Sequence, residues 1–423
     1  MFQRLRSVVH EFPRSFWVLV LASYIDVIGR SSVTVFFAIY VTRRFGVGMT
    51  EVGVLLALFA VAGMIGSTIG GALTDHFGRR SIIIFGLLSS ALTTLSFAFV
   101  PTLTLFYPIV IVAGLFSNIG GPAQGAMVAD LLGEEKRPQG FGIWRVAANV
   151  GWLTGPIVGG FLADVSIVMI FVLDAVASSI AAIIVLRAVP ESRPTHPAEN
   201  TPGGILASFK GYGTVMRDLA FLAFIIPSVL SGIAYQQSYE PLTVYLQDVH
   251  ALSAKTIGTL FSLDALFVVL LQFPFIRWAQ KRSPFLMMSL GMAITGVGLT
   301  LYGAVSGYPL FAVARLSIAT GEMLWMPTGQ ALATRFAPEH MRGRYMAYFG
   351  LTFGIATAVA PMLGGLIMDN LDPRWLWYVS GMISAASVLG FLRLHRKQQS
   401  EGSMLSPSGE DRGESPGETE QAP

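Results

Sequence analysis

The most regular feature of the chain is a succession of apolar stretches, each long enough to cross a lipid bilayer. A transmembrane helix needs about 20 consecutive, mostly apolar residues, and short polar segments separate the stretches. This pattern predicts an all-α membrane protein with twelve transmembrane helices. The predicted helices cover residues 16–41, 50–74, 81–100, 103–130, 140–163, 166–189, 218–247, 256–278, 285–306, 308–334, 344–368 and 374–394.

The composition agrees with this prediction and excludes several classes of protein. Hydrophobic residues make up 53% of the chain and charged residues only 13%, whereas soluble domains carry about 25% charge. The chain has no cysteine, which excludes disulfide bonds, thiolate metal sites and a cysteine nucleophile. Its net charge of +3 is too small to indicate nucleic-acid binding.

The basic residues indicate how the helices are oriented. Cytoplasmic loops of membrane proteins carry an excess of Lys and Arg. With both chain ends in the cytoplasm, 21 of the 28 Lys and Arg residues fall in inner segments and 4 fall in outer loops. The sequence therefore predicts a multi-pass protein of the cell membrane with both termini in the cytoplasm.

Polar segments divide the chain into two bundles of six helices. Residues 190–217 are polar and contain four prolines, so they are predicted to be a cytoplasmic linker between bundles at 16–189 and 218–394. Residues 1–15 are predicted to be a cytoplasmic N-terminus. Residues 395–423 are rich in Ser, Gly, Pro and Glu, a composition typical of a disordered, solvated tail rather than of a partner-binding segment.

An internal repeat relates the two bundles. Positions 205 residues apart carry identical residues, many of them glycines and prolines, which mark fixed backbone features. The matched pairs are Tyr40 and Tyr245, Gly53 and Gly258, Gly86 and Gly291, Pro122 and Pro327, Glu134 and Glu339, Arg137 and Arg342, Pro156 and Pro361, Gly159 and Gly364, Gly160 and Gly365, and Asp164 and Asp369. Two helical halves repeated in parallel around a midplane site form the architecture of a transporter.

Three motifs carry a resemblance to a known family. The sequence GALTDHFGRR at 71–80, between the second and third spans, resembles the signature loop of the major facilitator superfamily, and residues 16–395 fit its twelve-helix plan. The sequence GxxxGPxxGG at 151–160 resembles a motif of the drug:proton antiporters of that superfamily. The Gly-Glu pair at 321–322, followed by Pro327, is similar to the lactococcal-type multidrug exporters.

The resemblance implies that the signature loop is a gate. Its glycines permit close helix approach and a tight turn, and its charged groups can lock the cytoplasmic ends of the two halves together. The alternative is a simple basic turn on the cytoplasmic side, although Asp75 has no topological reason to be there. The residues assigned to this gate are Gly71, Asp75, Gly78, Arg79, Arg80 and Asp130.

The small residues of the fifth span have two interpretations. The residues concerned are Gly151, Gly155, Pro156, Gly159 and Gly160. They permit tight helix packing and a bend. The resemblance implies a hallmark of export, whereas the recurrence of the same pattern at 361–365 favours ordinary packing, so the motif alone does not decide between export and import.

Eight ionisable residues lie within the predicted spans. They are Asp26, Arg30, Arg145, Asp174, Glu240, Asp264, Arg315 and Glu322. Each costs about 2.5–3.5 kcal/mol at a helix centre, so these side chains must be paired, lie near an interface or face water. Five acids against three arginines leave acids without an obvious partner, and a carboxylate in that situation binds protons readily.

Several of these residues are candidates for proton coupling and substrate binding. Asp26 and Arg30 share one helix face and form either a functional pair or a pair that eases insertion. Glu322, in the middle of its span, is the best candidate for a proton or a cationic substrate. Asp174 and Asp264 are equally compatible with a functional role and with a structural role in the outer half.

The remaining candidates are polar or aromatic neighbours of these charges. Tyr235 and Gln236 form with Glu240 a cluster that should line a cavity rather than face lipid. Trp325 lies beside Glu322 and could form part of an apolar wall. The arginine motif usual in the fourth span of the superfamily is missing, and the nearest intramembrane arginine is Arg145, with Asn149 one turn later.

These observations predict a secondary active transporter that exports amphiphilic or cationic drug-like compounds in exchange for protons by alternating access. A proton-coupled symporter that imports a sugar, a peptide or another small solute is the alternative, because it would use the same fold and acids. A non-transporting membrane sensor is a third possibility. The chain has no phosphate-binding loop of the GxxxxGK[ST] type, so ATP is not the expected energy source.

An enzyme is not expected. The sequence offers no Ser/His/Asp, metal-binding or paired-carboxylate arrangement, and its six histidines lie near span ends or in loops. No cofactor and no metal are therefore expected. The expected partners are a small-molecule substrate, protons and the lipid bilayer, without nucleic acid, and the protein is expected to be a monomer.

Overall fold

The computed structural model describes residues 11–192, 215–338 and 341–400. Most of the predicted linker and tail, together with residues 1–10 and the side chains of Asp75 and Arg342, lie outside the described part. Every regular element in the described residues is a helix, which confirms the predicted fold class. The helices are α2 (Arg14–Phe45), α3 (Met49–Phe77), α4 (Arg79–Phe97), α5 (Leu103–Ser117), α6 (Gly121–Leu131), η1 (Glu134–Lys136), α7 (Arg137–Val165), α8 (Met169–Ala188), α10 (Leu219–Gln236), α11 (Glu240–Asp248), α12 (Ala254–Ala279), α13 (Pro284–Ala304), α14 (Tyr308–Phe336), α15 (Arg342–Asn370) and α16 (Trp375–Ser400).

Two of the predicted spans are interrupted. The span predicted at 103–130 consists of α5 and α6, and the span predicted at 218–247 consists of α10 and α11. Each second segment carries a proline in its first turn, Pro122 in α6 and Pro241 in α11. Proline is favoured in the first turn of a helix, where its missing backbone N–H would be unpaired anyway, and each break consists of the three residues before that turn, 118–120 and 237–239. The other ten spans are continuous helices, and α16 continues past its predicted end at 394 to Ser400.

In the part of the chain that the structure describes, 11 helices are long and apolar enough to cross a membrane, when each interrupted span counts as one. The remaining long helix is α14, which has 29 residues. It carries Arg315 and Glu322, and these charges lower its apolar character. Its length is nevertheless sufficient to cross a bilayer of about 30 Å.

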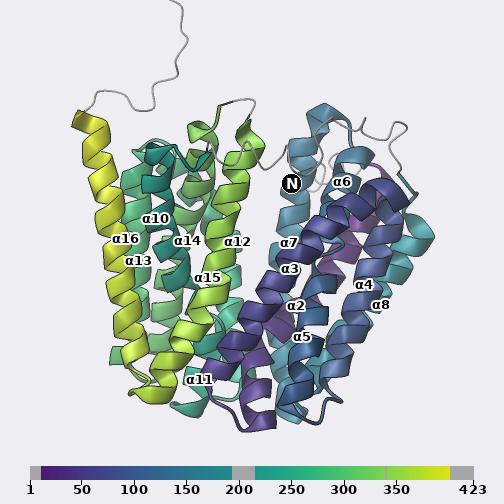
Figure 1. The fold of residues 1–423 in the computed structure, drawn as a ribbon, viewed down its shortest axis with the longest axis horizontal. Helices are drawn as coiled ribbons and strands as arrows, with labels where there is room; N and C mark the ends of the chain where they lie inside the picture. Colours follow the sequence, from purple (N-terminus) through teal and green to yellow (C-terminus); the bar gives the residue numbers. More distant parts are fainter. Residues whose placement is uncertain (1–10, 193–214, 339–340, 401–423) are drawn as a thin grey trace, which may run out of the picture.

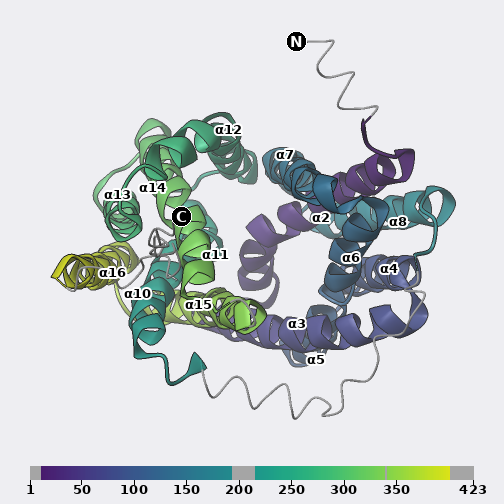
Figure 2. The same cartoon turned by 90° about the horizontal axis from the view of Figure 1, so that it is seen from above.

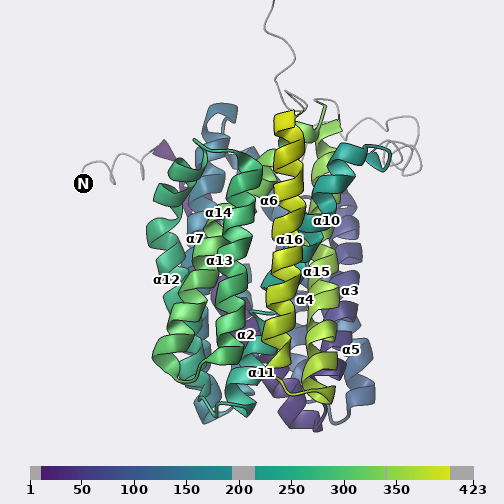
Figure 3. The same cartoon turned by 90° about the vertical axis from the view of Figure 1, so that its left-hand side faces the viewer.

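Helices α2–α8 form one bundle and helices α10–α16 the other, and the two bundles lie side by side (Figure 1). Their helices run along a common direction (Figure 3). Helix α2 begins and α8 ends at the upper end in Figure 1, which we call the linker end. We call the lower end the far end. The ribbons of the two bundles are closest at the far end.

The repeat seen in the sequence is also a repeat of contacts. The hydroxyl of Tyr40 donates to the carbonyl of Phe97 at 2.7 Å. The hydroxyl of Tyr245 donates to the carbonyl of Tyr302 at 3.0 Å. Donors and acceptors in the two halves are both 205 residues apart, so each half closes its far end in the same way.

The halves meet mainly along two seams, α7 against α12 and α3 against α15 (Figure 2), and α11 also contacts α2. Glycines allow backbone contact at both seams. A Cβ atom at Gly53 would lie 2.5 Å from the Cα of Met362, and one at the repeat-related Gly258 would collide with the carbonyl of Pro156. Larger residues at these two positions would force the halves apart at the far end.

A carboxylate caps a helix of the opposite half at each seam. Asp369 accepts hydrogen bonds from the backbone N–H of Met49 at 2.9 Å, from the N–H of Thr50 at 2.8 Å and from its hydroxyl at 2.6 Å. The repeat-related Asp164 accepts from the N–H of Lys255 at 3.3 Å. Carboxylates stabilise helix N-termini. We call Asp369 and Asp164 the far-end caps, and they hold the halves together at that end.

Candidate functional site

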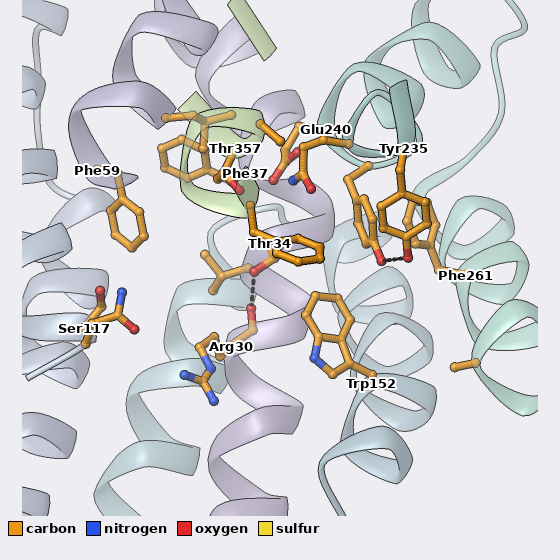
Figure 4. Close-up of a pocket in the computed structure, with 18 of the residues that line it drawn as sticks. Arg30, Thr34, Phe37, Phe59, Ser117, Trp152, Tyr235, Glu240, Phe261 and Thr357 are labelled. Carbon is orange, nitrogen blue, oxygen red and sulfur yellow. Dashed lines mark hydrogen bonds between the residues drawn. The ribbon is translucent and has the colours of Figure 1, made fainter. Parts of the chain in front are cut away.

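A cavity of about 580 Å³ lies between the two halves (Figure 4). Helices of both bundles line it, and its volume is in the range typical of ligand sites, about 300–1,000 Å³. Much of its wall is aromatic. The aromatic residues that line it are Phe37, Phe59, Phe97, Trp152, Tyr235, Tyr239, Phe261 and Phe353.

The wall formed by α2 presents an arginine to the cavity. Arg30 lines the cavity, and its Nη2 lies 3.6 Å from Oδ2 of Asp26. Asp26 itself is buried behind the wall, where its Oδ1 accepts a hydrogen bond of 2.8 Å from the hydroxyl of Ser178. The structure thus places the predicted pair at the cavity but turns only the guanidinium toward it.

A second acid lies close to this pair. Asp174 of α8 is buried and lines the cavity. Its backbone packs against Gly29, where a Cβ atom would lie 2.6 Å from the Cα of Asp174. Asp174 therefore belongs to the cavity wall in the first half.

The opposite wall contains a buried ion pair. Nη2 of Arg315 lies 2.9 Å from Oδ2 of Asp264, and Nη1 donates at 2.6 Å to the carbonyl of Ser238. The guanidinium carbon is 4.3 Å from the ring centroid of Phe261 and 5.3 Å from that of Tyr239. Arg315 is thus fixed in place, and through Ser238 it holds the break between α10 and α11.

Glu322 lies at the end of a short hydrogen-bonded chain. The hydroxyl of Tyr235 donates to Oε2 of Glu322 at 2.6 Å, and the hydroxyls of Tyr235 and Tyr239 are 2.8 Å apart. Glu322, Tyr235 and Tyr239 all line the cavity. The carboxyl group of Glu322 therefore has a neutral donor beside it and direct access to a ligand.

Trp325 occupies a different place from the one predicted. Its side chain is buried and does not line the cavity. Its ring lies 5.8 Å from that of Tyr235 and 6.1 Å from that of Phe353. Since both of those residues face the cavity, Trp325 supports the wall from behind instead of forming it.

The other predicted residues of this group divide between the wall and its surroundings. Glu240, the first residue of α11, is buried, lines the cavity and has no hydrogen-bond partner for its Oε2 among the described residues. Gln236 and Asn149 also line the cavity. Arg145 is exposed and is absent from the cavity lining, although it lies one turn from Asn149 toward the linker end of α7.

The signature loop makes its described charge contact within the first half. Nε of Arg79 lies 3.1 Å from Oδ2 of Asp130, which also accepts a hydrogen bond of 2.8 Å from the hydroxyl of Ser192. Asp75, the third predicted member, has its side chain outside the described part. The pair of Arg79 and Asp130 fixes α4 to α6, so this bond is not itself a link between the two halves.

The other residues of the loop have separate roles. Gly78 adopts φ +93°, which only glycine tolerates easily. The guanidinium of Arg80 donates to the carbonyl of Leu186. The expectation of a close helix approach at Gly71 is wrong for this structure, because a Cβ atom there would meet nothing within 4 Å. The face of α3 that carries Gly71 is unpacked at that position.

The small residues of α7 serve two interfaces. Those spaced four apart, Gly151, Gly155 and Gly159, pack against α2, and the hydroxyl of Ser32 donates to the carbonyl of Gly155 at 2.7 Å. Gly160 packs against α12 of the other half, where a Cβ atom would lie 2.7 Å from the carbonyl oxygen of Ala254. The motif thus combines packing within one half with closure of the α7–α12 seam.

Several residues that build this site were not predicted from the sequence. The far-end caps were recognised only as members of the repeat, yet each follows a Gly-Gly pair by four residues at the end of a span. Such an acid could have been read as a cap for a helix facing it. Ser238 lies three residues before Pro241, but a proline alone does not indicate a break in this chain, since Pro327 and Pro361 lie inside continuous helices. Nothing in the sequence pairs Ser178 with Asp26.

Comparison with known proteins agrees with this architecture. The family model of the Major Facilitator Superfamily matches residues 19–262 and 241–413. The chain is 27% identical over 371 residues to the tetracycline resistance protein, class H, of Pasteurella multocida, covering 84% of this chain and 90% of that protein. It is 25% identical over 358 residues to the Na(+), Li(+), K(+)/H(+) antiporter of Planococcus maritimus, covering 77% of this chain and 83% of that protein.

A solved structure shares the fold. The crystal structure of a POT family transporter in complex with 5-aminolevulinic acid superimposes with a TM-score of 0.77 at 16% identity, covering 91% of this chain and 96% of that one. At this identity the likeness concerns the arrangement of the helices alone.

Proposed function

The chain belongs to the major facilitator superfamily, and we propose that it is a secondary active transporter that exports amphiphilic or cationic drug-like compounds in exchange for protons. The linker end would face the cytoplasm, as the distribution of Lys and Arg predicts. Substrate would then enter the cavity from that side. The far-end caps and the two seams would close the path to the outside.

The observation that carries this proposal is that the cavity wall combines aromatic side chains with carboxylates that have no basic partner in the described part of the chain. Asp174, Glu240 and Glu322 line the cavity, and within the described residues none of them has a salt bridge. Inside a membrane such a group binds either a proton or the cationic group of a ligand. Aromatic faces attract cations and cover apolar surface, so an organic cation fits the cavity.

Glu322 is the residue we assign to exchange. When it is ionised, its carboxylate accepts from Tyr235 and attracts a cationic ligand. Opening of the far end would expose the same carboxylate to outside protons. Protonation removes the charge that held the ligand, and the ligand leaves. Because one group binds either species but not both, the two fluxes are coupled.

Exchange of inorganic cations for protons is a second candidate. The relative from Planococcus maritimus is named as an exchanger of Na(+), Li(+) and K(+) for protons, and unpaired carboxylates could bind a small cation. The aromatic lining favours an organic substrate, because an inorganic cation needs several oxygen ligands instead. Proton flux driven by Na⁺ or K⁺ in vesicles, without any organic substrate, would support this candidate.

The test is dye efflux from proteoliposomes under an imposed pH gradient, with Glu322→Gln as the variant. Glutamine keeps the size of the side chain and accepts from Tyr235, but it cannot exchange a proton. We expect Glu322→Gln to lose the acceleration that the gradient gives to the wild type. Glu135→Gln, at an exposed position in η1, is the matched control. Gradient-driven efflux at the wild-type rate in Glu322→Gln would remove Glu322 from the mechanism.

A further inference from the structure

The two arginines that line the cavity differ sharply in how many of their N–H donors are free to bind a ligand. The side chain of Arg315 is 2% exposed and is engaged by Asp264, by the carbonyl of Ser238 and by two aromatic rings. The side chain of Arg30 is 51% exposed. Its one described ion pair, to Asp26, is 3.6 Å long. A guanidinium has five N–H donors in a planar fork, so most donors of Arg30 remain open to a ligand.

The acids near Arg30 do not block it. The carboxylate of Asp26 is 11% exposed and is engaged on its other side by Ser178. Asp174 is 3% exposed. Both acids are thus buried, and the ion pair with Asp26 orients the guanidinium of Arg30 while leaving most of its donors free. Neutral polar side chains complete this part of the wall, namely Thr34, Ser117, Asn118 and Asn149.

The carboxylates that remain available belong largely to the other half. Glu240 and Glu322 line the cavity from α11 and α14. Figure 4 shows Arg30 and Glu240 at separate places around the cavity, on ribbons of different halves. Among the described residues, the cavity therefore presents its one accessible arginine on the first half and two of its three unpaired carboxylates on the second, with the third, Asp174, buried in the wall of the first half.

We propose that Arg30 binds an anionic group of the substrate, a carboxylate or an acid of similar shape, and that the substrates are amphiphilic zwitterions. The planar fork of arginine matches the two oxygens of a carboxylate. The cationic group of the same molecule would lie at Glu322. This inference rests on the proposed function and narrows its substrate class.

A zwitterion would also link substrate binding to the movement of the halves. Its anionic end is held by α2 of the first half and its cationic end by α14 of the second. A ligand that contacts both halves stabilises the state in which those contacts are shortest, and a ligand can shift a conformational equilibrium only through such a difference. A simple cation at Glu322 has no anionic end to place at Arg30, so it lacks this link between α14 and α2.

The test uses two fluorescent probes that differ in one group. The first is a zwitterionic xanthene dye with a free carboxylate, and the second is its ethyl ester, which is a cation only. Binding to the purified full-length protein is measured by fluorescence anisotropy. We expect the wild type to bind the zwitterion about tenfold or more tightly than the ester, as a charge-assisted bidentate pair implies.

The variant Arg30→Gln should lose that preference, because binding of the zwitterion weakens about tenfold while binding of the ester stays unchanged. The charge-balanced double variant Asp26→Asn/Arg30→Gln should give the same result without leaving an unneutralised acid. Arg145→Gln removes an arginine of the same half that does not line the cavity, and it should behave as the wild type.

Two results would overturn the inference. One is a wild type that binds the ester as tightly as the zwitterion. The other is a double variant in which the binding of both dyes weakens equally, which would indicate a structural role for Arg30. Dye efflux from proteoliposomes distinguishes a failure of this inference about zwitterions from a failure of the proposed export function. Transport of the ester under a pH gradient would leave proton-coupled export standing, whereas transport of neither dye would refute both.

Discussion

The far-end cap at Asp369 offers a direct test of how the two halves are held together. Its carboxylate accepts three hydrogen bonds from Met49 and Thr50, at 2.9, 2.8 and 2.6 Å, across the seam between α15 and α3. Replacement by alanine removes both acceptor oxygens, and with them all three hydrogen bonds and the favourable charge at the N-terminus of α3. The perturbation acts only while the far end is closed, since opening separates the two helices.

The expected size of the effect follows from these bonds. Loss of an N-cap costs about 0.5–2 kcal/mol, and a hydrogen bond to a charged group contributes about 1.5–3 kcal/mol. Part of this is recovered because water solvates the freed N–H groups at an exposed site. A net loss of about 1–2 kcal/mol would raise the population with an open far end by a factor of about 5–30.

The absence of cysteine in the chain makes the assay simple. A cysteine at Leu56, which lines the cavity two turns into α3, is labelled in cells by a thiol reagent that does not cross the membrane. We expect Asp369→Ala to raise the labelling rate by the same factor of about 5–30. Asp372→Ala is the control, because the side chain of Asp372 accepts from the N–H of the neighbouring Arg374 and has no hydrogen bond to the other half among the residues that the structure describes. Equal rates in the two variants would refute the reasoning.

Three further predictions follow from the structure. Gly258→Ala should disturb the α7–α12 seam and lower the melting temperature of the purified protein, because overpacking costs about 1–3 kcal/mol, whereas Gly71→Ala, which has open space, should not. Arg315→Ala should destabilise the fold by about 3–5 kcal/mol in thermal unfolding, because it leaves a buried carboxylate uncompensated, and adding Asp264→Asn should recover much of that loss. Burial lowers the pKa of His250 in the loop between α11 and α12, so the folded state favours the neutral ring. Stability should therefore fall as the pH drops below 6.5 and through the lower folded pKa, and His250→Gln should flatten that part of the melting-temperature profile.

The sequence predicts the helices well because the bilayer imposes a length and an apolar composition on every span. It predicts the repeat for a related reason, since glycine and proline mark backbone features that cannot move without changing the fold. The two interruptions were missed because hydropathy averages over a window and does not register a break of three residues. Pro122 and Pro241 lie just after those breaks, but proline alone does not locate them, because the repeat-related Pro327 lies inside the continuous helix α14.

The pairing of side chains was less predictable, because it depends on how helices rotate about their axes. Arg315 and Asp264 are 51 residues apart, and their bond depends on the packing of α14 against α12. The same rotation turns Trp325 away from the cavity although it follows Glu322 by only three residues. Spacing within one helix predicts a shared face, as for Asp26 and Arg30, but it does not show which member of the pair reaches the cavity.

The two seams explain why the same motif recurs in α7 and α15, and they also differ in strength. Both use a Gly-Gly pair and a following aspartate against a helix of the other half. Asp369 makes three bonds of 2.6–2.9 Å, whereas Asp164 makes one of 3.3 Å. The cap therefore contributes less to holding α7 against α12 than it does to holding α3 against α15.

We accordingly expect opening at the far end to begin at the α7–α12 seam, with the α3–α15 seam as the later or more restricted contact. Pairs of spin labels at the far ends of the two helices of each seam would measure this. The distance distribution across α7–α12 should be the broader one, and Asp164→Ala should widen it further while leaving α3–α15 unchanged. A broader distribution across α3–α15 would contradict the order, because it would mean that the seam with more hydrogen bonds is the weaker one.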